Sequence, residues 1–300
     1  MKRPYYLLDV FTDVPLAGNP LAVVLESSGL DTERMQKIAR EFNLSETVFI
    51  LDPHDPVNTA RLRIFTTVKE LPFAGHPTVG TAALLAELRA PEHLKSRHVG
   101  VVLEEPIGIV SCTVRRPQGS ATLAHFDLPK LPEQAGTTAP KFRIAAALGL
   151  AEADLGFGAH QPALYSAGLP SMLVPVKDLA TIARARPDLS LFGEIFGETA
   201  VYLYTTETCE KENDLHARMF GPALGVFEDP ATGAAAAALA GALMIFEKPE
   251  NGDHTVRIEQ GFEMGRPSLI VLGMTVADGV LQNASIGGPV VVIGQGTIDL

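Results

Sequence analysis

The sequence predicts a mixed fold of the α/β or α+β class, built from two similar halves that each hold a central helix among short strands. Three observations predict it. Several sequence blocks recur in the second half in the same order. Short apolar runs typical of strands alternate with helical patterns in both halves. The segment 230–246 is apolar on every side, as expected of a helix surrounded by protein.

The repeat consists of four pairs of blocks that keep their order and nearly their spacing. The pairs are Ala17–Val24 with Ala167–Val174, Glu46–Phe49 with Thr199–Tyr202, Arg63–Phe65 with Arg218–Phe220, and Pro77–Ala82 with Pro230–Ala235. Each block alone is a common turn, strand or helix start. A collinear set is typical of a duplicated chain, so each half is expected to repeat one order of strands and helices.

The first predicted helix spans residues 31–42. Asp31 is a favoured N-cap residue, and Asn43 suits a left-handed C-cap. Apolar residues recur at helical spacing on one face, namely Met35, Ile38, Ala39 and Phe42. This pattern predicts an amphipathic helix that packs against a sheet.

Two further helices are predicted at about 77–89 and 230–246, and the second differs from the first in being apolar all round. Pro77 and Pro230 suit the first helical position, which places His76 and Asp229 at the N-caps. Because a helix N-terminus carries unpaired N–H groups and a positive dipole end, each start can hold an anion. Two such starts facing one cleft would suit a carboxylated substrate.

The turn at 116–119 is the best candidate for a domain boundary, since it combines proline and glycine between strand-like runs. We therefore expect one domain from 1–117, completed by 286–300, and a second from 118–285. The predicted site lies in the cleft between them.

Composition excludes several classes of function. The 300 residues carry a formal net charge of -11, and no basic run is present, which argues against nucleic-acid or acidic-membrane partners. The N-terminal residues lack the apolar core of a signal peptide, and the two cysteines form no disulfide framework, so a cytoplasmic protein is expected. No zinc, nucleotide or nucleophile motif occurs, so neither a zinc site nor a nucleotide-cofactor site is predicted.

Glu46 is the leading candidate for chemistry. It stands where the helix 31–42 gives way to an apolar strand, in the same repeat unit as His76, whereas the aligned residue of the other half is the neutral Thr199. A single carboxylate can both remove and return a proton. Taken alone, Glu46 would more often be a solvated strand end and Asp229 a simple cap.

These blocks resemble the PhzF family of phenazine-biosynthesis-like proteins, which share the diaminopimelate epimerase fold. The resemblance spans nearly the whole chain and is carried by Asp9–Asp13, Leu16–Val23, Asn43–Thr47, Glu70–Gly80, Glu228–Gly233, Gln260–Gly261 and Met264–Ser268.

The resemblance implies an α+β fold of two pseudo-symmetric domains, each a mixed sheet or barrel around a central helix, assembled as a homodimer. It also implies a cofactor-independent isomerase in which Glu46 moves a proton. It makes His76 and Asp229 the polar partners of substrate and proton, and Gly75 a backbone contact. By the same motifs, the remaining substrate-binding candidates are Ser45, Thr232, Gly233 and Ala234.

One position departs from the family pattern, because Ala234 replaces a serine whose hydroxyl is thought to bind substrate. The phenazine precursor is therefore not the assured substrate. Two alternatives stay open, a non-catalytic binding protein and an amino-acid epimerase with a second base. A two-thiol epimerase is excluded, because the positions of its cysteines hold Ala74 and Pro230.

Overall fold

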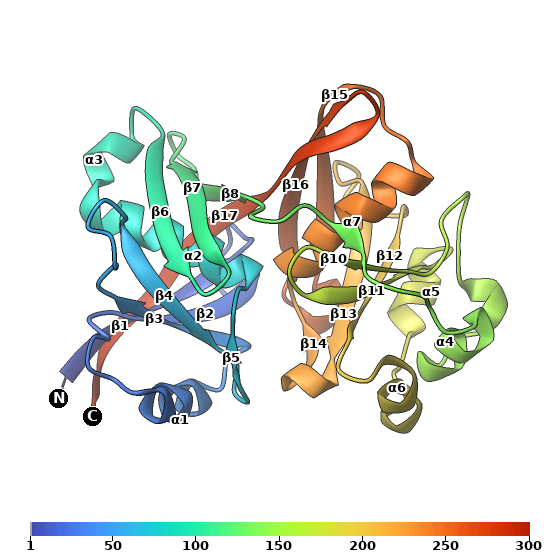
Figure 1. Ribbon diagram of the computed structural model, residues 1–300, viewed down its shortest axis with the longest axis horizontal. Helices are drawn as coiled ribbons and strands as arrows, with labels where there is room; N and C mark the ends of the chain where they lie inside the picture. Colours follow the sequence, from blue (N-terminus) through green and yellow to red (C-terminus); the bar gives the residue numbers. More distant parts are fainter. Residues whose placement is uncertain (1) are drawn as a thin grey trace. The chain divides into compact units, whose positions relative to one another are not determined.

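A computed structural model describes residues 2–300 and separates into two compact units (Figure 1). The first unit comprises the chain up to Pro129 together with Ile286–Leu300, and the second unit comprises Lys130–Ser285. The final strand, β17 (Val280–Asp299), contains the point at which the chain returns to the first unit.

The first unit contains most of the longer strands of the N-terminal half and three helices. Its strands are β1 (Lys2–Val10), β2 (Asn19–Val24), β3 (Glu46–Leu51), β4 (Ala60–Phe65), β5 (Glu70–Leu71), β6 (Val99–Glu105), β7 (Gly108–Arg115) and β8 (Thr122–Asp127). Its helices are α1 (Thr32–Phe42), α2 (Gly75–Arg89) and α3 (Pro91–Leu94).

Eight strands of the first unit close into a barrel. Neighbours pair in the order β17, β1, β2, β3, β4, β6, β7 and β8, and β8 returns to β17. The β2–β3 and β4–β6 pairs are parallel, whereas the β17–β1, β1–β2, β3–β4, β6–β7 and β7–β8 pairs are antiparallel. Closure leaves this barrel without a free sheet edge.

The helix α2 is enclosed by these strands. Its residues from Gly75 to Ala86 are all buried, and it packs against β1, β2, β3, β6, β7 and β8. Small residues make this possible, since a Cβ added at Gly80 would lie 2.7 Å from side-chain atoms of Leu21 and Val10. The sequence suggested that only the second central helix is apolar all round, but the burial of α2 is equally complete.

The amphipathic helix α1 lies outside the barrel strands and begins and ends as predicted. The side chain of Asp31 accepts a hydrogen bond from the main-chain N–H of Arg34, and Asn43 adopts the left-handed conformation with φ of 52°. The predicted apolar face packs on β2, β3 and β4 in one core cluster, whose buried members are Val24, Met35, Ile38, Ala39, Phe49, Leu51 and Phe65.

The second unit repeats this plan with more helices. Its strands are β9 (Glu133–Gln134), β10 (Ala163–Ser166), β11 (Pro170–Pro175), β12 (Ala200–Thr205), β13 (Leu215–Gly221), β14 (Val226–Asp229), β15 (Gly252–Gln260) and β16 (Ser268–Ala277). Its α-helices are α4 (Lys141–Ala147), α5 (Leu179–Arg184), α6 (Leu189–Phe196) and the buried α7 (Gly233–Phe246), and its 3₁₀ turns are η1 (Glu152–Asp154), η2 (Pro222–Leu224) and η3 (Phe262–Met264).

Strand pairing confirms the duplication. The antiparallel β1–β2, parallel β2–β3 and antiparallel β3–β4 pairs recur as β10–β11, β11–β12 and β12–β13. The parallel β4–β6 pair and the β6–β7 hairpin recur as β13–β15 and β15–β16. The predicted α+β architecture of two similar halves with central helices is therefore confirmed.

The register also corrects one alignment. In β3, Glu46 stands beside Leu21, and the matching pair in the second unit is Ala200 beside Ser171. The counterpart of Glu46 is therefore Ala200, and the predicted partner Thr199 lies one residue before the strand. A gap of one residue between repeat blocks is invisible to a match of short motifs, whereas hydrogen-bond register fixes it.

The turn at 116–119, which was the predicted boundary, lies within the first unit. The main-chain N–H of Ser120 bonds to the carbonyl of Pro117, and the strand that follows, β8, pairs with β7. The chain enters the second unit only at Lys130. A hairpin turn and a domain linker share the same proline and glycine content, so composition did not separate them.

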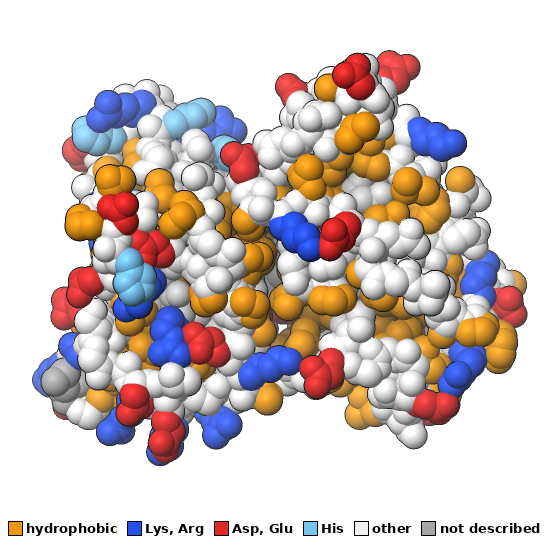
Figure 2. Space-filling view, viewed as in Figure 1, with side chains coloured by type: hydrophobic (Ala, Val, Ile, Leu, Met, Phe, Trp, Pro, Cys, Tyr) orange, Lys and Arg blue, Asp and Glu red, His pale blue; other side chains and the backbone are white. Residues whose placement is uncertain are grey.

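The surface mixes charges of both signs. On the face shown in Figure 2, lysine and arginine side chains are interspersed with aspartate and glutamate side chains. Within residues 2–300, none of the helices has the length and apolar character needed to cross a membrane.

Candidate active site

Glu46 is the first residue of β3 and follows the left-handed turn at Asn43 that ends α1. β3 runs parallel to β2, and the next residue, Thr47, is fully buried. The Glu46 side chain is only 14% exposed. The short connection therefore places a carboxylate at the end of two buried strands, where little water reaches it.

His76 lies next to this carboxylate. It is the second residue of α2, its side chain is 4% exposed, and its Nε2 is 3.4 Å from Oε2 of Glu46. On its other side, Nδ1 is 3.2 Å from the amide nitrogen of Asn19, the first residue of β2. Three elements of the first unit thus contribute one side chain each to a row from Asn19 through His76 to Glu46.

The row fixes the protonation of the imidazole. Burial lowers the pKa of His76 to about 3, so the ring is neutral at neutral pH. The amide nitrogen of Asn19 can only donate, so Nδ1 is the acceptor and the ring proton is assigned to Nε2. A neutral imidazole therefore presents its N–H toward Glu46.

Asn19 is a site residue that the sequence did not single out. It is fully buried, and the turn before it depends on Gly18, because a Cβ there would lie 2.4 Å from the carbonyl oxygen of Val10. The signal that drew attention to Glu46 was also present here, since the aligned residue of the repeat is the apolar Leu169. A polar residue opposite an apolar one marks a place where the halves differ.

The two helix starts differ from the prediction. α2 begins at Gly75 with Ala74 as N-cap, and α7 begins at Gly233 with Thr232 as N-cap. His76 therefore lies inside the first turn, and Asp229 ends the strand β14. The prolines suggested other starts because proline is common at N1, but it is tolerated throughout the first turn and before it.

The predicted residues of the second unit form a network of their own. The hydroxyl of Thr232 donates to Oδ2 of Asp229 at 2.6 Å, and the side-chain amide of Gln260 donates to the carbonyl of Asp229 at 2.7 Å. Gln260 also donates to the Thr232 hydroxyl at 3.0 Å and accepts from the Thr232 N–H at 3.1 Å. Gln260, the last residue of β15, was not predicted as a site residue.

The remaining predicted residues lie at the starts of the same elements. Ser45 directly precedes β3, Gly75 is the buried first residue of α2, and Gly233 and Ala234 are the first two residues of α7. The first unit thus brings Ser45, Glu46, Gly75 and His76 into one neighbourhood, and the second unit does the same for Asp229, Thr232, Gly233 and Ala234.

A carboxylate holds the loop between the third and fourth strands of the first unit. Glu104 on β6 accepts hydrogen bonds from the side-chain amide of Asn58 and the main-chain N–H groups of Asp55 and His54, at 2.8 to 2.9 Å. These bonds lower the pKa of Glu104 to about 2, the amide of Asn58 contributing most. Glu104 is therefore ionised and structural.

Glu259 on β15 repeats this role in the second unit. It accepts from the N–H groups of Cys209 and Glu210 and from the side chain of Asn213. Its fourth donor is Nδ1 of His216, at 2.7 Å. Equivalent loops in the two units are thus held by equivalent glutamates, which is further evidence of duplication. No sequence motif predicted this role.

Cys209, His216 and Glu259 have side chains of the types that bind metal ions, and their potential ligand atoms lie within 4.8 Å of one another. Burial alone would lower the pKa of His216, but hydrogen bonds to Glu259 and Glu263 outweigh it and raise this pKa to about 9. An imidazolium offers no lone pair to a metal. The charge of protonated His216 is balanced by the carboxylates to which it is hydrogen-bonded, Glu259 and Glu263. The expected absence of a metal stays a prediction.

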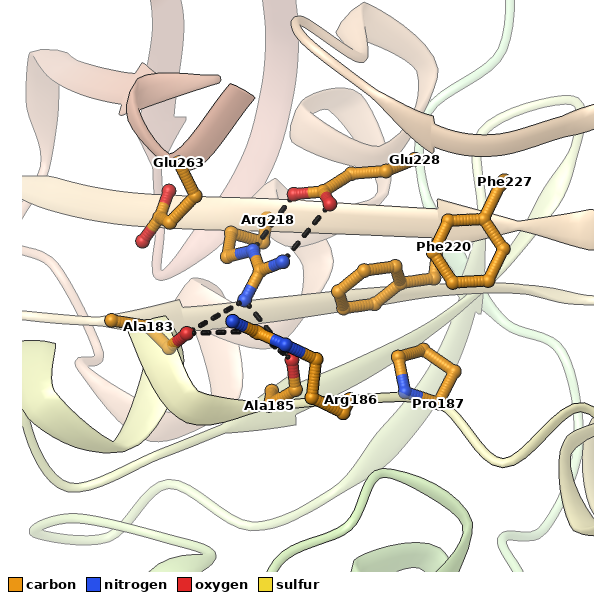
Figure 3. A pocket seen from close by; sticks show the side chains of 9 residues that line it. All are labelled: Ala183, Ala185, Arg186, Pro187, Arg218, Phe220, Phe227, Glu228 and Glu263. Atoms are coloured by element: carbon orange, nitrogen blue, oxygen red, sulfur yellow. Dashed lines mark hydrogen bonds and ion pairs between the residues drawn. The ribbon is translucent and has the colours of Figure 1, made fainter. Parts of the chain in front are cut away.

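A separate pocket of about 360 Å³ lies within the second unit (Figure 3). At its centre Arg218 forms a bidentate ion pair with Glu228 and donates to the carbonyls that end α5. Phe220 and Phe227 line one side, with ring centroids 6.0 Å apart. None of the lining residues is a predicted site residue.

Comparison with known sequences identifies the family. A family model described as phenazine biosynthesis-like protein matches residues 8–296. The chain is 50% identical to an uncharacterized isomerase of Mesorhizobium japonicum, covering 99% of this chain and 98% of that one. It is 34% identical to trans-2,3-dihydro-3-hydroxyanthranilate isomerase of Pseudomonas chlororaphis, covering 99% of each.

Solved structures agree in fold. A PhzF-family protein of Bacillus anthracis has a TM-score of 0.88 and 26% identity, with full coverage of both chains. A hydroxyproline epimerase of Agrobacterium vitis, at a TM-score of 0.66 and 13% identity, shares the fold alone. The enzyme class common to the named relatives is that of an isomerase. The chain therefore belongs to the phenazine biosynthesis-like protein family of isomerases.

Proposed function

We propose that this isomerase acts without a cofactor on a small carboxylated substrate and that Glu46 carries the proton. The observation that carries the proposal is the row Asn19–His76–Glu46, in which a poorly exposed carboxylate faces a neutral imidazole N–H. Of the residue types in this row, a carboxylate is the one suited to removing a proton near neutral pH.

The proposed reaction is a proton shift within one molecule. Ionised Glu46 removes a proton from a substrate carbon, the electron pair of that C–H bond moves into the neighbouring unsaturated system, and Glu46 returns the proton to a second carbon. The carboxylate is regenerated, so no oxidant, reductant or second substrate is consumed. One group serves as base and then as acid, which agrees with the apolar Ala200 at the matching position of the repeat.

His76 assists as a neutral hydrogen-bond donor. Its Nε2–H faces Glu46 at 3.4 Å, so it can hold the carboxylate or a substrate oxygen in place. Asn19 keeps the ring in this tautomer by occupying Nδ1. We propose that Asp229 and the start of α7 contact the substrate, as the family resemblance implies.

The first substrate to test is trans-2,3-dihydro-3-hydroxyanthranilate, which the Pseudomonas relatives isomerise by name. Ala234 stands where the family pattern has serine, and alanine cannot supply a hydroxyl to a ligand. Related carboxylates should therefore be tested beside it.

The decisive experiment combines the Glu46→Gln variant with D₂O. Wild-type protein should place deuterium from solvent into the product at the carbon that Glu46 reprotonates. Glu46→Gln keeps the shape of the side chain but removes the base, so turnover should fall about 10²- to 10⁴-fold. Product formation and deuterium content are followed by mass spectrometry.

The control is Glu41→Gln, the same change at an exposed residue of α1. It should retain wild-type turnover. An unchanged kcat in Glu46→Gln would refute the mechanism. Wild-type turnover in D₂O that leaves every product free of deuterium would mean that the transferred proton does not exchange with water.

A further inference from the structure

Glu105 is a buried carboxyl group that the reaction as proposed does not use. It ends β6, is 7% exposed, and its Oε1 lies 2.8 Å from the hydroxyl oxygen of Thr78 in the first turn of α2. The same hydroxyl oxygen lies 2.8 Å from the carbonyl oxygen of Ala74, the N-cap of α2. Three oxygens thus form a chain that ends at the helix start.

Counting protons in this chain fixes the state of Glu105. A hydroxyl has one proton to donate, and a main-chain carbonyl can only accept. If Thr78 donates to Ala74, the second contact is a hydrogen bond only when Glu105 carries a proton on Oε1 and donates it to Thr78. A neutral acid satisfies both contacts, whereas an ionised carboxylate satisfies one.

The surroundings of Glu105 favour the neutral acid. Its second oxygen, Oε2, accepts no hydrogen bond from residues 2–300, and an ionised oxygen buried in this way would be costly. Burial accordingly raises the pKa of Glu105 to about 8. Cys112 on β7 is also neutral, because burial raises the pKa of its thiol. Within residues 2–300, no cation is among the groups that shift the pKa of Glu105.

The second unit has a residue at the position equivalent to Glu105, and it provides independent evidence. Strand pairing sets Glu104 beside Arg61 and Glu259 beside His216 in equivalent parallel pairs. Each of these two glutamates braces the equivalent loop. The residues that follow them, Glu105 and Gln260, are therefore counterparts.

Gln260 donates to a threonine hydroxyl at the start of the central helix of its unit, as a protonated Glu105 would do in the first unit, although Thr232 is the N-cap of α7 and Thr78 lies within α2. Its side-chain NH₂ donates to the hydroxyl of Thr232, the N-cap of α7, at 3.0 Å, and to the carbonyl of Asp229 just before the helix. An amide donates at every pH, whereas a carboxyl group donates only while protonated. One half of the molecule thus uses glutamine where the other half uses glutamic acid.

The Ala74 carbonyl, which ends this chain of three oxygens, belongs to the peptide group that joins Ala74 to Gly75. The N–H of that peptide group is therefore the N–H of Gly75. Hydrogen bonding to the carbonyl of a peptide strengthens the N–H as a donor, because neighbouring hydrogen bonds polarise one another. Gly75 precedes His76 directly. A change at Glu105 therefore reaches the backbone contact expected of Gly75.

We propose that Glu105 is a positioning residue, a neutral acid that donates through Thr78 to the Ala74–Gly75 peptide and so orients and strengthens the Gly75 N–H for substrate. Only the last step, substrate at Gly75, rests on the proposed function. When Glu105 ionises, the Thr78 hydroxyl turns to it, the Ala74 carbonyl loses its second donor, and the enzyme becomes less active at alkaline pH.

Nuclear magnetic resonance tests the relay without turnover. The amide shift of Gly75 in ¹⁵N-labelled full-length protein should move between pH 7 and pH 9 in the wild type and stay fixed in Glu105→Gln, which donates at both values. The control Thr81→Val, a buried threonine of α2 outside the chain of oxygens, should keep the wild-type movement. A Gly75 shift that moves equally in wild type and Glu105→Gln overturns the relay.

Kinetics then tests its purpose. With trans-2,3-dihydro-3-hydroxyanthranilate as probe, wild-type kcat/KM should fall about tenfold in all as the pH rises through about 8 and should then level off, whereas Glu105→Gln should show no such fall and should match the wild type at pH 7. Thr78→Val should lower kcat/KM about tenfold at pH 7, and Thr78→Ser should restore it. An alkaline fall that persists in Glu105→Gln overturns the positioning role. No turnover by the wild type refutes the proposed function for this substrate, and the Gly75 shift still decides the relay.

Discussion

The Glu105→Gln substitution should change how the stability of the protein depends on pH. The pKa of Glu105 rises from 4.5 to about 8 on folding, because burial disfavours the charge. Between these values the native state keeps a proton that the unfolded chain releases. Stability from this group is therefore complete below pH 4.5 and is lost as the pH rises through about 8.

The size of the effect follows from the shift. Each pH unit inside the window costs the wild type roughly 1.4 kcal/mol of unfolding free energy, so the loss between pH 5 and pH 8 is roughly 4 kcal/mol. Glutamine does not titrate, so the free energy of unfolding of Glu105→Gln should rise by that amount relative to the wild type between pH 5 and pH 8. His216 adds an alkaline loss of its own, but it is common to both proteins.

Urea unfolding followed by far-ultraviolet circular dichroism is the assay, since the chain has no tryptophan for fluorescence. The matched control is Glu104→Gln, one residue earlier on β6. Hydrogen bonds hold the pKa of Glu104 near 2, so this variant should lose stability by a constant amount from pH 5 to pH 8. Parallel curves for wild type and Glu105→Gln would refute the reasoning, because they would mean that Glu105 is ionised in the native state.

Two further predictions concern packing and charge. Gly80→Ala should lower the unfolding free energy, measured in urea, by about 1–3 kcal/mol, because its Cβ would lie 2.7 Å from side-chain atoms of Leu21 and Val10 inside the barrel. The control is Gly193→Ala in α6, where nothing lies within 4 Å of the new Cβ, and it should not lower the unfolding free energy. Equal losses in the two variants would contradict this account. The ring protons of His216 should titrate near pH 9 by nuclear magnetic resonance, and Glu263→Gln should lower that midpoint by removing one of its two carboxylate partners. A midpoint near 6.5 in the wild type would show that the brace is not charged.

Local sequence was enough to predict α1 in detail. Its cap residues, Asp31 and Asn43, and its apolar face all act within the helix or one residue beyond it. Such short-range preferences can be recognised without knowledge of the rest of the chain. The same holds for the strands on either side of the repeated turns.

The starts of the buried helices were predicted less well, because proline marks a first turn without saying where the first hydrogen bond closes. In α2 that bond runs from Thr78 to Ala74, which puts His76 inside the helix. The domain boundary was displaced for a similar reason. The turn before β8 has the composition of a linker, and only the pairing of β8 with β7 shows that it is a hairpin.

The sequence by itself determined that the chain is duplicated, that its second central helix is apolar on every side, and that Glu46 stands where the two halves differ. Those conclusions depend on order, composition and short-range propensity, which a linear chain carries. Only the tertiary structure decided that Asn19 sets the tautomer of His76, that Ala200 is the true counterpart of Glu46, and that Glu105 and Gln260 occupy equivalent places. Each of these depends on strand register and on contacts between residues far apart in the chain, and a change of one residue in register alters which side chains meet.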